Sequence, residues 1–479
     1  MDLAVSAVTG ELLSRFISFL LSKYSSHEIS QEQQLDKLQQ LLLRVCTVVE
    51  EADSRYITNS GMLMQLKLLA DAMYRGHHVM DMFRCRTHTQ DNLIDQVSNQ
   101  FPPLKRFRAI VDASGNDKAR YLELHRTLGI LETAVDHMAE FVVLLGGCER
   151  MSRRPYDAYL YIDNFMFGRH TEKQRLLNFL LEYNPPGLQP PIIGGLSVGK
   201  KTLVAHVCAD ERVQSQFSTI LHLNEDDLLR FANSDALLSG KVLAVVEFVS
   251  DVNESSWEEF YTSLAQMNGS KVITISRFRK SEELGTVKPI LLENHSYEEL
   301  SYLFKTLAFG SANPQDYPHL LQIAEEFAME MQLRGSLVAA NIAADVLRRN
   351  LDVKFWLCIL NKFITVAEKN LSLYGKNVQL LVQQGHRIDI TNLASSPATP
   401  LHVIPCIGAT TVAMNDLPKV TYRELLLDST VRPKGEFNLV SWESRLPPYT
   451  SFVHFVPDCA QDMPEDKPLS GRKRRGVPS

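Results

Sequence analysis

The sequence has few of the features that mark a secreted, zinc-binding or membrane-spanning chain. It holds only seven cysteines in 479 residues. The number is odd and no CxxC pair occurs, so we expect buried thiols in a reducing compartment and neither a disulfide framework nor a zinc site. The apolar run at 12–21 is interrupted by Arg15 and is too short to cross a bilayer. The first residues lack the positive charge of a signal peptide. We therefore expect a soluble protein inside the cell.

The chain also lacks a dominant charge, an internal repeat and an obvious nucleophilic triad. Its net charge is −6, spread along the length, which gives the whole chain no electrostatic case for binding nucleic acid. No period of 20 to 50 residues is present, and this argues against a repeat array. A hydrophobic content of 45% is ordinary for globular proteins, and the length of 479 residues predicts two to four domains.

Residues 1–150 predict an α-helical bundle. Apolar residues recur at steps of three and four in 5–20, 35–49, 63–80 and 119–146, as on helices that bury one face. His77 and His78 are neighbours on such a helix, so they point about 100° apart and cannot form an i, i+4 metal pair. We interpret them as a surface or interface pair.

The rest of the chain predicts a central α/β domain followed by a helical and then a β-rich region. Three apolar runs in 166–285 read as strands, with helical segments between them, which is typical of a doubly wound sheet. They cover 220–223, 241–247 and 270–277. Residues 286–372 are periodic as helices. Residues 376–460 read either as a small β-rich domain or as irregular chain packed on the core. The short β-prone runs are 378–382, 401–407, 410–414, 437–442 and 452–456.

The last segment, 461–479, is polar and contains three prolines, so we expect a disordered tail. It carries the basic cluster Arg472–Arg475. Two interpretations stay open for this cluster: a nuclear-import or phosphate-binding patch, and a solvated tail.

The segment from Gly194 to Leu203 is the strongest functional motif. A phosphate-binding loop needs Gly, four residues, Gly, Lys and then Ser or Thr. Gly194, Gly199 and Lys200 fit that spacing, and an apolar run precedes the loop while a helical pattern follows it. The position that should carry a hydroxyl for magnesium holds Lys201, and Thr202 offers a hydroxyl one residue late. The motif thus predicts nucleotide binding and leaves hydrolysis open.

Two further residues stand where a nucleotide site needs charge. Glu247 ends a predicted strand, where an acid usually holds magnesium, but Phe248 follows where a second acid is common. Glu247 is either the catalytic or magnesium-binding carboxylate or an ordinary strand-end carboxylate. Arg277 ends the next strand, where an arginine can sense the terminal phosphate. An exposed strand-end arginine is the alternative.

These residues resemble a known family. The chain is similar over about residues 1–360 to plant nucleotide-binding leucine-rich-repeat immune receptors with a coiled-coil (Rx-type) N-terminal domain, and within them to a divergent grass subgroup. Residues 72–81 occupy the place of the family's acidic signature, where Val79 and Asp81 match and two histidines replace acids. Residues 194–203 resemble the phosphate loop of its NB-ARC module. Residues 210–217 resemble the block that follows, and 270–277 the sensor strand, with Arg277 as sensor.

The resemblance implies further roles and also has departures. It implies that the backbone at Gly168 and Arg169 lies beside adenine. The family's Gly-Leu-Pro-Leu segment is present only as 334–337, without its proline. The Met-His-Asp triplet and the leucine-rich repeats are absent. The resemblance does not cover the region after about 376.

The resemblance implies a signalling protein of plant innate immunity that binds ADP or ATP with weak or no hydrolysis. A lysine at the hydroxyl position disfavours magnesium, so we expect binding that depends little on the metal. The N-terminal helices are expected to contact other proteins or a second copy. The expected location is the cytoplasm, or the nucleus if the Arg472–Arg475 tail directs import. The alternative is a non-enzymatic adaptor or decoy with an empty nucleotide site. A nucleic-acid kinase or helicase is disfavoured by the acidic balance and the missing second acid.

Overall fold

The computed structural model describes three packed regions of the chain. The described residues are 31–86, 117–150, 167–182, 191–194, 198–232, 240–248, 254–267, 269–277, 288–334, 337–394, 400–405, 417–428, 431, 435–443, 449 and 451–458. The predictions for 5–20, 410–414 and the tail with Arg472–Arg475 lie outside these residues. In the described part of the chain, no helix is long and apolar enough to cross a membrane.

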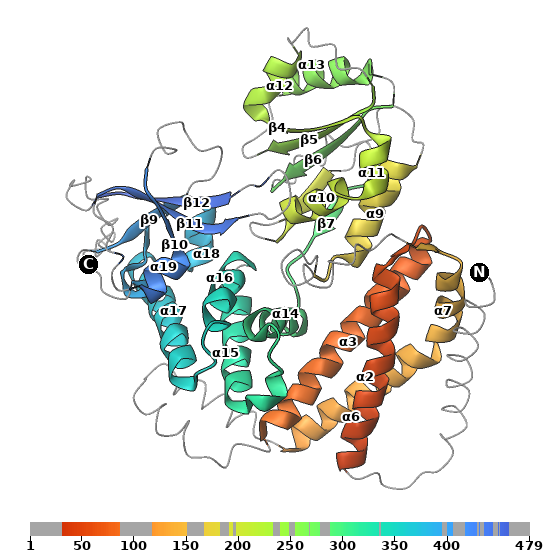
Figure 1. Cartoon of the computed structure of the whole chain (residues 1–479), viewed down its shortest axis with the longest axis vertical. Coiled ribbons are helices and arrows are strands. Elements are labelled where there is room, and N and C mark those ends of the chain that lie inside the picture. The colour runs from red at the N-terminus through yellow and green to blue at the C-terminus, as the bar shows by residue number, and fades with distance from the viewer. Residues whose placement is uncertain are drawn as a thin grey trace, which may run out of the picture.

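The first region is a helical bundle, at the right of Figure 1. It consists of α2 (Gln31–Asp53), α3 (Ser60–Arg86), α6 (Asp117–Asp136) and α7 (Met138–Gly146). Leucines and valines spaced at three and four residues along α2, α3 and α6 form one common core, which is why these segments are helical and antiparallel neighbours. The short strand β1 (Arg55–Tyr56) lies between α2 and α3, and β2 (Glu149–Arg150) follows α7. The two strands pair antiparallel.

The second region is a five-stranded parallel sheet in the order β4-β5-β6-β3-β7. Apolar residues follow one another along β5 and β6 without alternating with polar ones, because both faces of these strands are buried. The strands are β3 (Pro191–Gly194), β4 (Thr219–Asn224), β5 (Val242–Phe248), β6 (Lys271–Ser276) and β7 (Ile290–Leu292). The three strands predicted from the sequence match β4, β5 and β6 to within one residue at each end.

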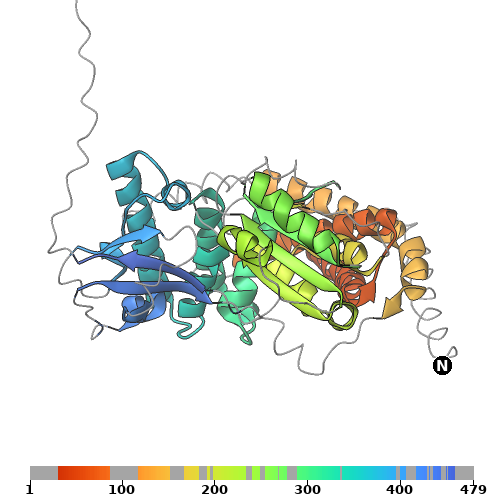
Figure 2. The same cartoon turned by 90° about the horizontal axis from the view of Figure 1, so that it is seen from above.

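Helices cover both faces of this sheet, as Figures 1 and 2 show. On one face α9, α10 and α11 share a core with β3, β5, β6 and β7, and on the other face α12 and α13 pack on β5 and β6. These helices are α9 (His170–Leu181), α10 (Lys200–Cys208), α11 (Glu211–Gln216), α12 (Glu225–Ala232) and α13 (Glu254–Ala265). The arrangement is the doubly wound sheet that the sequence predicts.

The predicted boundary at 285 between the central domain and the helical region is wrong. Strand β7 lies at 290–292 and pairs with β3, so the sheet takes its last strand from the segment that was predicted to be helical. The run is only three residues long, and Leu291 between its two buried residues is 46% exposed. A strand this short gives too little periodicity to be recognised in the sequence.

The third region combines helices and a second five-stranded sheet around one core. Its helices are α14 (Tyr297–Phe309), α15 (Pro318–Arg334), α16 (Leu337–Leu347), α17 (Val353–Tyr374), α18 (Val378–Gln383) and α19 (Tyr422–Leu427), with short 3-10 turns at Pro314–Asp316 and Thr391–Leu393. The sheet order is β10-β11-β12-β9-β8. Its strands are β8 (Ile388–Asp389), β9 (His402–Pro405), β10 (Lys419–Thr421), β11 (Phe437–Glu443) and β12 (Ser451–Val456).

One hydrophobic core contains buried residues from α14, beginning with Leu300, through to Val456 of β12. The C-terminal strands therefore complete the core of the preceding helices. One expectation for this region is wrong: the β-prone run 378–382 is the helix α18. Asn377 explains the difference, because its side chain accepts a hydrogen bond from the Leu380 N–H at 2.8 Å and caps the helix.

A buried charge cluster joins the bundle to the third region. Lys305 of α14 is 5% exposed, and its ammonium donates hydrogen bonds to Asp81 of α3 and, at 2.7 Å, to Glu325 of α15. The two carboxylates raise the pKa of Lys305 against the effect of burial. Glu325 also accepts hydrogen bonds from Tyr297 at 2.6 Å and Ser301 at 2.9 Å, and Lys305 holds its pKa well below the usual range.

The two histidines of α3 take part in the same contact. His77 Nε2 lies 3.4 Å from Cys46 Sγ, and its ring lies against Tyr302 of α14. Burial lowers the pKa of His77 to about 4, so this side chain is neutral at pH 7. His78 lies 3.8 Å from Glu325 and packs on Tyr297. His77 and His78 thus lie at an interface between regions.

Candidate functional site

The predicted phosphate loop connects β3 to α10 at the carboxyl edge of the central sheet. Gly194 is the last residue of β3, and residues 195–197 lie outside the described part of the chain. Gly199 has φ 89° and is the N-cap of α10 without a side-chain cap, a conformation that suits glycine. The first backbone N–H groups of α10 need partners from outside the helix. Strand, turn and helix therefore provide the local geometry of an anion site.

Lys200 begins α10 and is the charged residue nearest to this helix end. Burial lowers its pKa from 10.5 to about 8, against the opposing effect of Glu247, and the charges of Lys201 and Arg277 lower it further. Lys201 lies 2.8 Å from Glu247, and Arg277 follows Ser276, which pairs with Phe248, so four charged groups gather at this end of the sheet. A lysine whose charge costs free energy in the ligand-free protein gains the most from an incoming anion.

Nucleotide affinity should therefore depend on pH in the alkaline range. An anion favours charged Lys200, so binding takes up a proton once the pH exceeds the pKa of about 8. We expect ADP affinity to fall about tenfold between pH 7.5 and pH 9 if the bound lysine stays charged throughout. Calorimetric titration at several pH values measures this. The Lys200→Arg variant, whose side chain stays charged, should lose most of the dependence, and a flat profile in the unaltered protein would contradict the role of Lys200.

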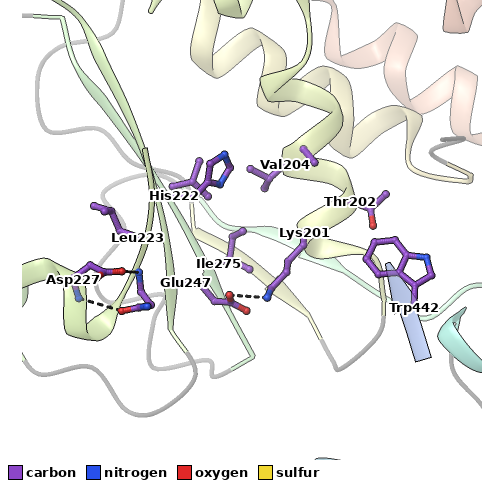
Figure 3. Close-up of a pocket in the computed structure, with 12 residues that line it drawn as sticks. Lys201, Thr202, Val204, His222, Leu223, Asp227, Glu247, Ile275 and Trp442 are labelled. Atoms are coloured by element: carbon purple, nitrogen blue, oxygen red, sulfur yellow. Dashed lines mark hydrogen bonds and ion pairs between the residues drawn. The ribbon is translucent and has the colours of Figure 1, made fainter. Parts of the chain in front are cut away.

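Lys201 makes the central contact of the site. Its ammonium lies 2.8 Å from Glu247 Oε2 at the end of β5, with each side chain 34% exposed. Figure 3 shows the lysine reaching across from α10 to this carboxylate. The sequence placed Lys201 at the hydroxyl position and Glu247 at the acid position of a magnesium site. In the structure these two residues pair with each other, so an ammonium takes the place between loop and strand that a metal would need.

A cavity of about 180 Å³ opens beside this pair. At about 30 Å³ of liquid volume per molecule, that volume corresponds to roughly six waters. Its walls come from α10, from the sheet face formed by β4, β5 and β6, and from β11 of the C-terminal sheet (Figure 3). The lining residues are Lys201, Thr202, Val204, Ala205, His222, Leu223, Asn224, Asp227, Val245, Glu247, Ile275 and Trp442. Thr202, whose hydroxyl comes one residue late in the motif, thus faces the cavity.

Arg277 follows β6 and reaches the third region. Its Nη1 donates a hydrogen bond to the Gln383 carbonyl oxygen of α18 at 3.3 Å. The charge of Arg277 also acts on Lys200, as the lowered pKa shows. The guanidinium therefore links the end of β6 to α18. Its role as a phosphate sensor stays a prediction.

Phe167, Gly168 and Arg169 form a junction between regions. Arg169 is 6% exposed and donates hydrogen bonds to the carbonyl oxygens of Glu293 and, at 3.4 Å, Val198. Gly168 has φ 66°, and Phe167 packs on Tyr74 of the bundle at 4.9 Å between ring centroids. The Arg169 side chain thus fixes the loop and the end of β7. A place for adenine beside this backbone stays a prediction.

The structure brings together Lys200, Lys201, Thr202, Glu247 and Arg277 near the end of the sheet. In the described part of the chain, no group of three His, Cys, Asp or Glu residues could hold a metal ion. Sequence reasoning missed His222, Asp227 and Trp442 as lining residues. No motif marks them. Trp442 is more than 160 positions along the chain from every other lining residue, so no local pattern could have found it.

Comparison with known proteins supports a relation to plant disease resistance proteins. No protein-family model matches the chain. The chain is 23% identical over 329 residues to the disease resistance protein RGA2 of Solanum bulbocastanum, covering 62% of this chain and 32% of that protein. It is 22% identical over 356 residues to the putative disease resistance protein RGA1 of the same species, covering 68% and 35%. The chain thus spans about a third of the length of the curated relatives it matches.

Two solved structures show weaker likeness. One is the Drosophila ORC bound to DNA, at 14% identity and a TM-score of 0.25, covering 46% of this chain and 66% of that chain. The other is domain III of the Thermotoga maritima replication initiation protein DnaA, at 13% identity and a TM-score of 0.23, covering 48% and 92%. Scores this low carry no argument about this chain.

Proposed function

We propose that this protein binds ADP or ATP at the β3–α10 loop as part of plant defence signalling, with weak or no hydrolysis. The observation that carries the proposal is the 2.8 Å ion pair between Lys201 and Glu247. The loop supplies the anion site through Gly199, the start of α10 and Lys200. The relation to two disease resistance proteins supports the defence role.

The ion pair argues for binding without magnesium. A divalent cation beside Glu247 would lie within a few ångströms of the Lys201 ammonium, and like charges in a partly dehydrated site repel strongly. The ammonium can instead serve a phosphate directly. It then supplies the positive charge that magnesium supplies in related nucleotide sites.

The same substitution argues against efficient hydrolysis. In phosphoryl transfer the metal bridges the β- and γ-phosphates and neutralises the charge that develops in the transition state. A lysine can neutralise charge, but it cannot bridge the phosphates with a metal's geometry. The residue after Glu247 is Phe248, 3% exposed and packed on Trp257, so it provides no second acid. Nucleotide hydrolysis at this site is therefore expected to be slow.

The cellular setting follows from the relatives and from the surface of the bundle. We propose a role in plant innate immunity, in the cytoplasm, with the Arg472–Arg475 tail as a route to the nucleus. The bundle would supply contacts to other proteins or to a second copy. It carries exposed large apolar side chains on all four of its helices, which a partner could cover: Leu43, Met64, Leu68, Leu122, Val143 and Leu144.

A second candidate is a non-enzymatic adaptor with an empty nucleotide site. The observation that favours it is that two predicted site residues donate hydrogen bonds to the protein's own backbone. Arg169 bonds to carbonyl oxygens of Glu293 and Val198, and Arg277 bonds to that of Gln383. These contacts hold the loop, the end of β7 and α18 within the protein and need no ligand.

One experiment separates the two candidates. The purified protein is denatured and the supernatant is analysed by chromatography for ADP and ATP. The nucleotide-binding proposal expects released ADP or ATP near one equivalent per chain, or saturable binding when the nucleotide is added back. A chain that releases no nucleotide and binds none on addition is an adaptor.

A further inference from the structure

Two aromatic residues of the C-terminal sheet face the phosphate-loop lysine. In the antiparallel pair β11–β12, the register shifts between Val440 and Trp442, which leaves Ser441 as an extra residue and sets Trp442 opposite Phe452. A bulge of this kind redirects the side chains that follow it. The two rings lie 5.6 Å apart between centroids. Together they form what we call the aromatic wall, Trp442 and Phe452.

The aromatic wall lies against the nucleotide-binding region. The Lys201 ammonium is 5.9 Å from the centroid of the Phe452 ring, within the range of a cation–π contact. Trp442 lines the same cavity as Lys201 and Glu247 and stands beside Thr202 in Figure 3. Figure 1 shows β11 and β12 on the side of the C-terminal sheet that faces the central sheet. Trp442 and Phe452 thus lie beside Lys201, although each is more than 200 positions away from it in the sequence.

We propose that Trp442 and Phe452 are positioning residues that hold Lys201 beside Glu247. The inference rests on the proposed function of the loop as a nucleotide site that uses Lys201 in place of magnesium. A pair with both side chains one-third exposed is weak by itself, because water screens the charges and a lysine has many rotamers. The wall removes part of that freedom, since the ring attracts the ammonium and covers one side of it.

The aromatic wall makes the magnesium requirement of nucleotide binding depend on the C-terminal sheet. With Phe452 in place, the ammonium stays near Glu247 and repels a divalent cation. Without the ring, Lys201 spends more time in solvent and Glu247 becomes available to magnesium. The C-terminal sheet therefore contributes to how the site handles nucleotide, although none of its residues belongs to the loop motif.

The test measures the freedom of Lys201 directly and needs no nucleotide. The ligand-free protein is treated with a limiting amine-acylating reagent, and modification of Lys201 is followed by peptide mass spectrometry. We expect Phe452→Ala to raise the rate roughly two- to fivefold, the size of an exposed cation–π contact. Phe452→Tyr keeps a ring and should restore the original rate.

A matched control is available on the same strand. Phe455 lies on β12 with its side chain on the opposite face, because side chains alternate along a strand. Phe455→Ala should leave the Lys201 rate unchanged. Equal rates in the unaltered protein and in Phe452→Ala would overturn the positioning role, and so would an equal rise in Phe455→Ala.

A second measurement separates this inference from the proposed function. ADP titrations of Phe452→Ala with magnesium and with EDTA should show an affinity gain from the metal that the unaltered protein lacks. If the unaltered protein itself requires magnesium, the proposed metal-free site fails, and the acylation rates still decide whether the wall holds Lys201. If the unaltered protein binds without metal and Phe452→Ala does too, with an unchanged acylation rate, only the wall is wrong.

Discussion

Lys200→Ala is expected to weaken ADP binding by roughly 30-fold to several thousandfold. Truncating one partner of a partly buried charge pair costs about 2–5 kcal/mol, and each 1.4 kcal/mol is about tenfold in affinity. Lys200 begins α10, where the backbone N–H groups of the helix also point at an anion. The residual binding should come from those groups and from Lys201. Isothermal titration calorimetry with ADP measures the change.

Loss of binding in this variant would not reflect unfolding. Burial lowers the pKa of Lys200 to about 8, so its charge opposes folding at neutral pH, and removing it should leave the melting temperature equal or higher. Lys241→Ala is the matched control, because Lys241 is exposed at the opposite end of β5. It should bind ADP like the unaltered protein. Unchanged affinity in Lys200→Ala would mean that the loop is not the nucleotide site.

Lys305→Met should lower the free energy of unfolding by about 3–5 kcal/mol, the usual cost of leaving a buried charge without its partner. Lys305 is 5% exposed, and its ammonium joins Asp81 of the bundle to Glu325 of α15. Methionine keeps the length of the side chain but leaves two carboxylates facing each other. Denaturant unfolding followed by circular dichroism measures the change, and loss of the contact should also detach α3 from α14.

Two controls identify the charge as the cause. Arg349→Met removes a pair whose arginine is 49% exposed, and it should change stability by less than about 1 kcal/mol. The triple variant Asp81→Asn, Lys305→Met, Glu325→Gln leaves no unpaired charge and should recover most of the loss. A Lys305→Met protein as stable as the unaltered one would show that this cluster does not hold the regions together.

The same cluster gives the contact a pH dependence. Lys305 holds the pKa of Glu325 below its unfolded value near 4.5, so the stability from this carboxylate is present above that value and is lost as the pH falls through the folded pKa. The raised pKa of Lys305 means that its contribution is lost only when the pH exceeds the ordinary lysine range. The contact therefore persists at neutral pH and weakens in acid.

Local hydrophobic patterns predicted much of the fold, because buried strands and helices carry clear runs or periods of apolar residues. Strands β5 and β6 are mostly apolar and β-branched without alternation, since helices cover both sheet faces. The amphipathic helices of the bundle were equally clear. The pattern failed where the signal was short, at β7, and where a cap decided the structure, at Asn377 before α18. Lengths of three to six residues carry too few positions for a period to be recognised.

The sequence proposes individual site residues but not the pairs that they form. The sequence named Lys201 and Glu247 separately, and it left open whether Glu247 holds magnesium or is an ordinary strand-end carboxylate. Only the fold shows that the lysine itself is that partner. Lys305 with Asp81, and Phe452 with Lys201, are likewise contacts between distant segments. Nothing in the local sequence of either partner encodes such contacts.

The most direct test of the account is an ADP titration of the unaltered protein in magnesium and in EDTA. The Lys201–Glu247 pair predicts affinities that agree within about twofold, a difference of less than about 0.5 kcal/mol. Lys201→Thr, which restores the hydroxyl and frees Glu247, should bind ADP more tightly with magnesium than without. Loss of ADP binding to the unaltered protein in EDTA would contradict the claim that Lys201 replaces the metal.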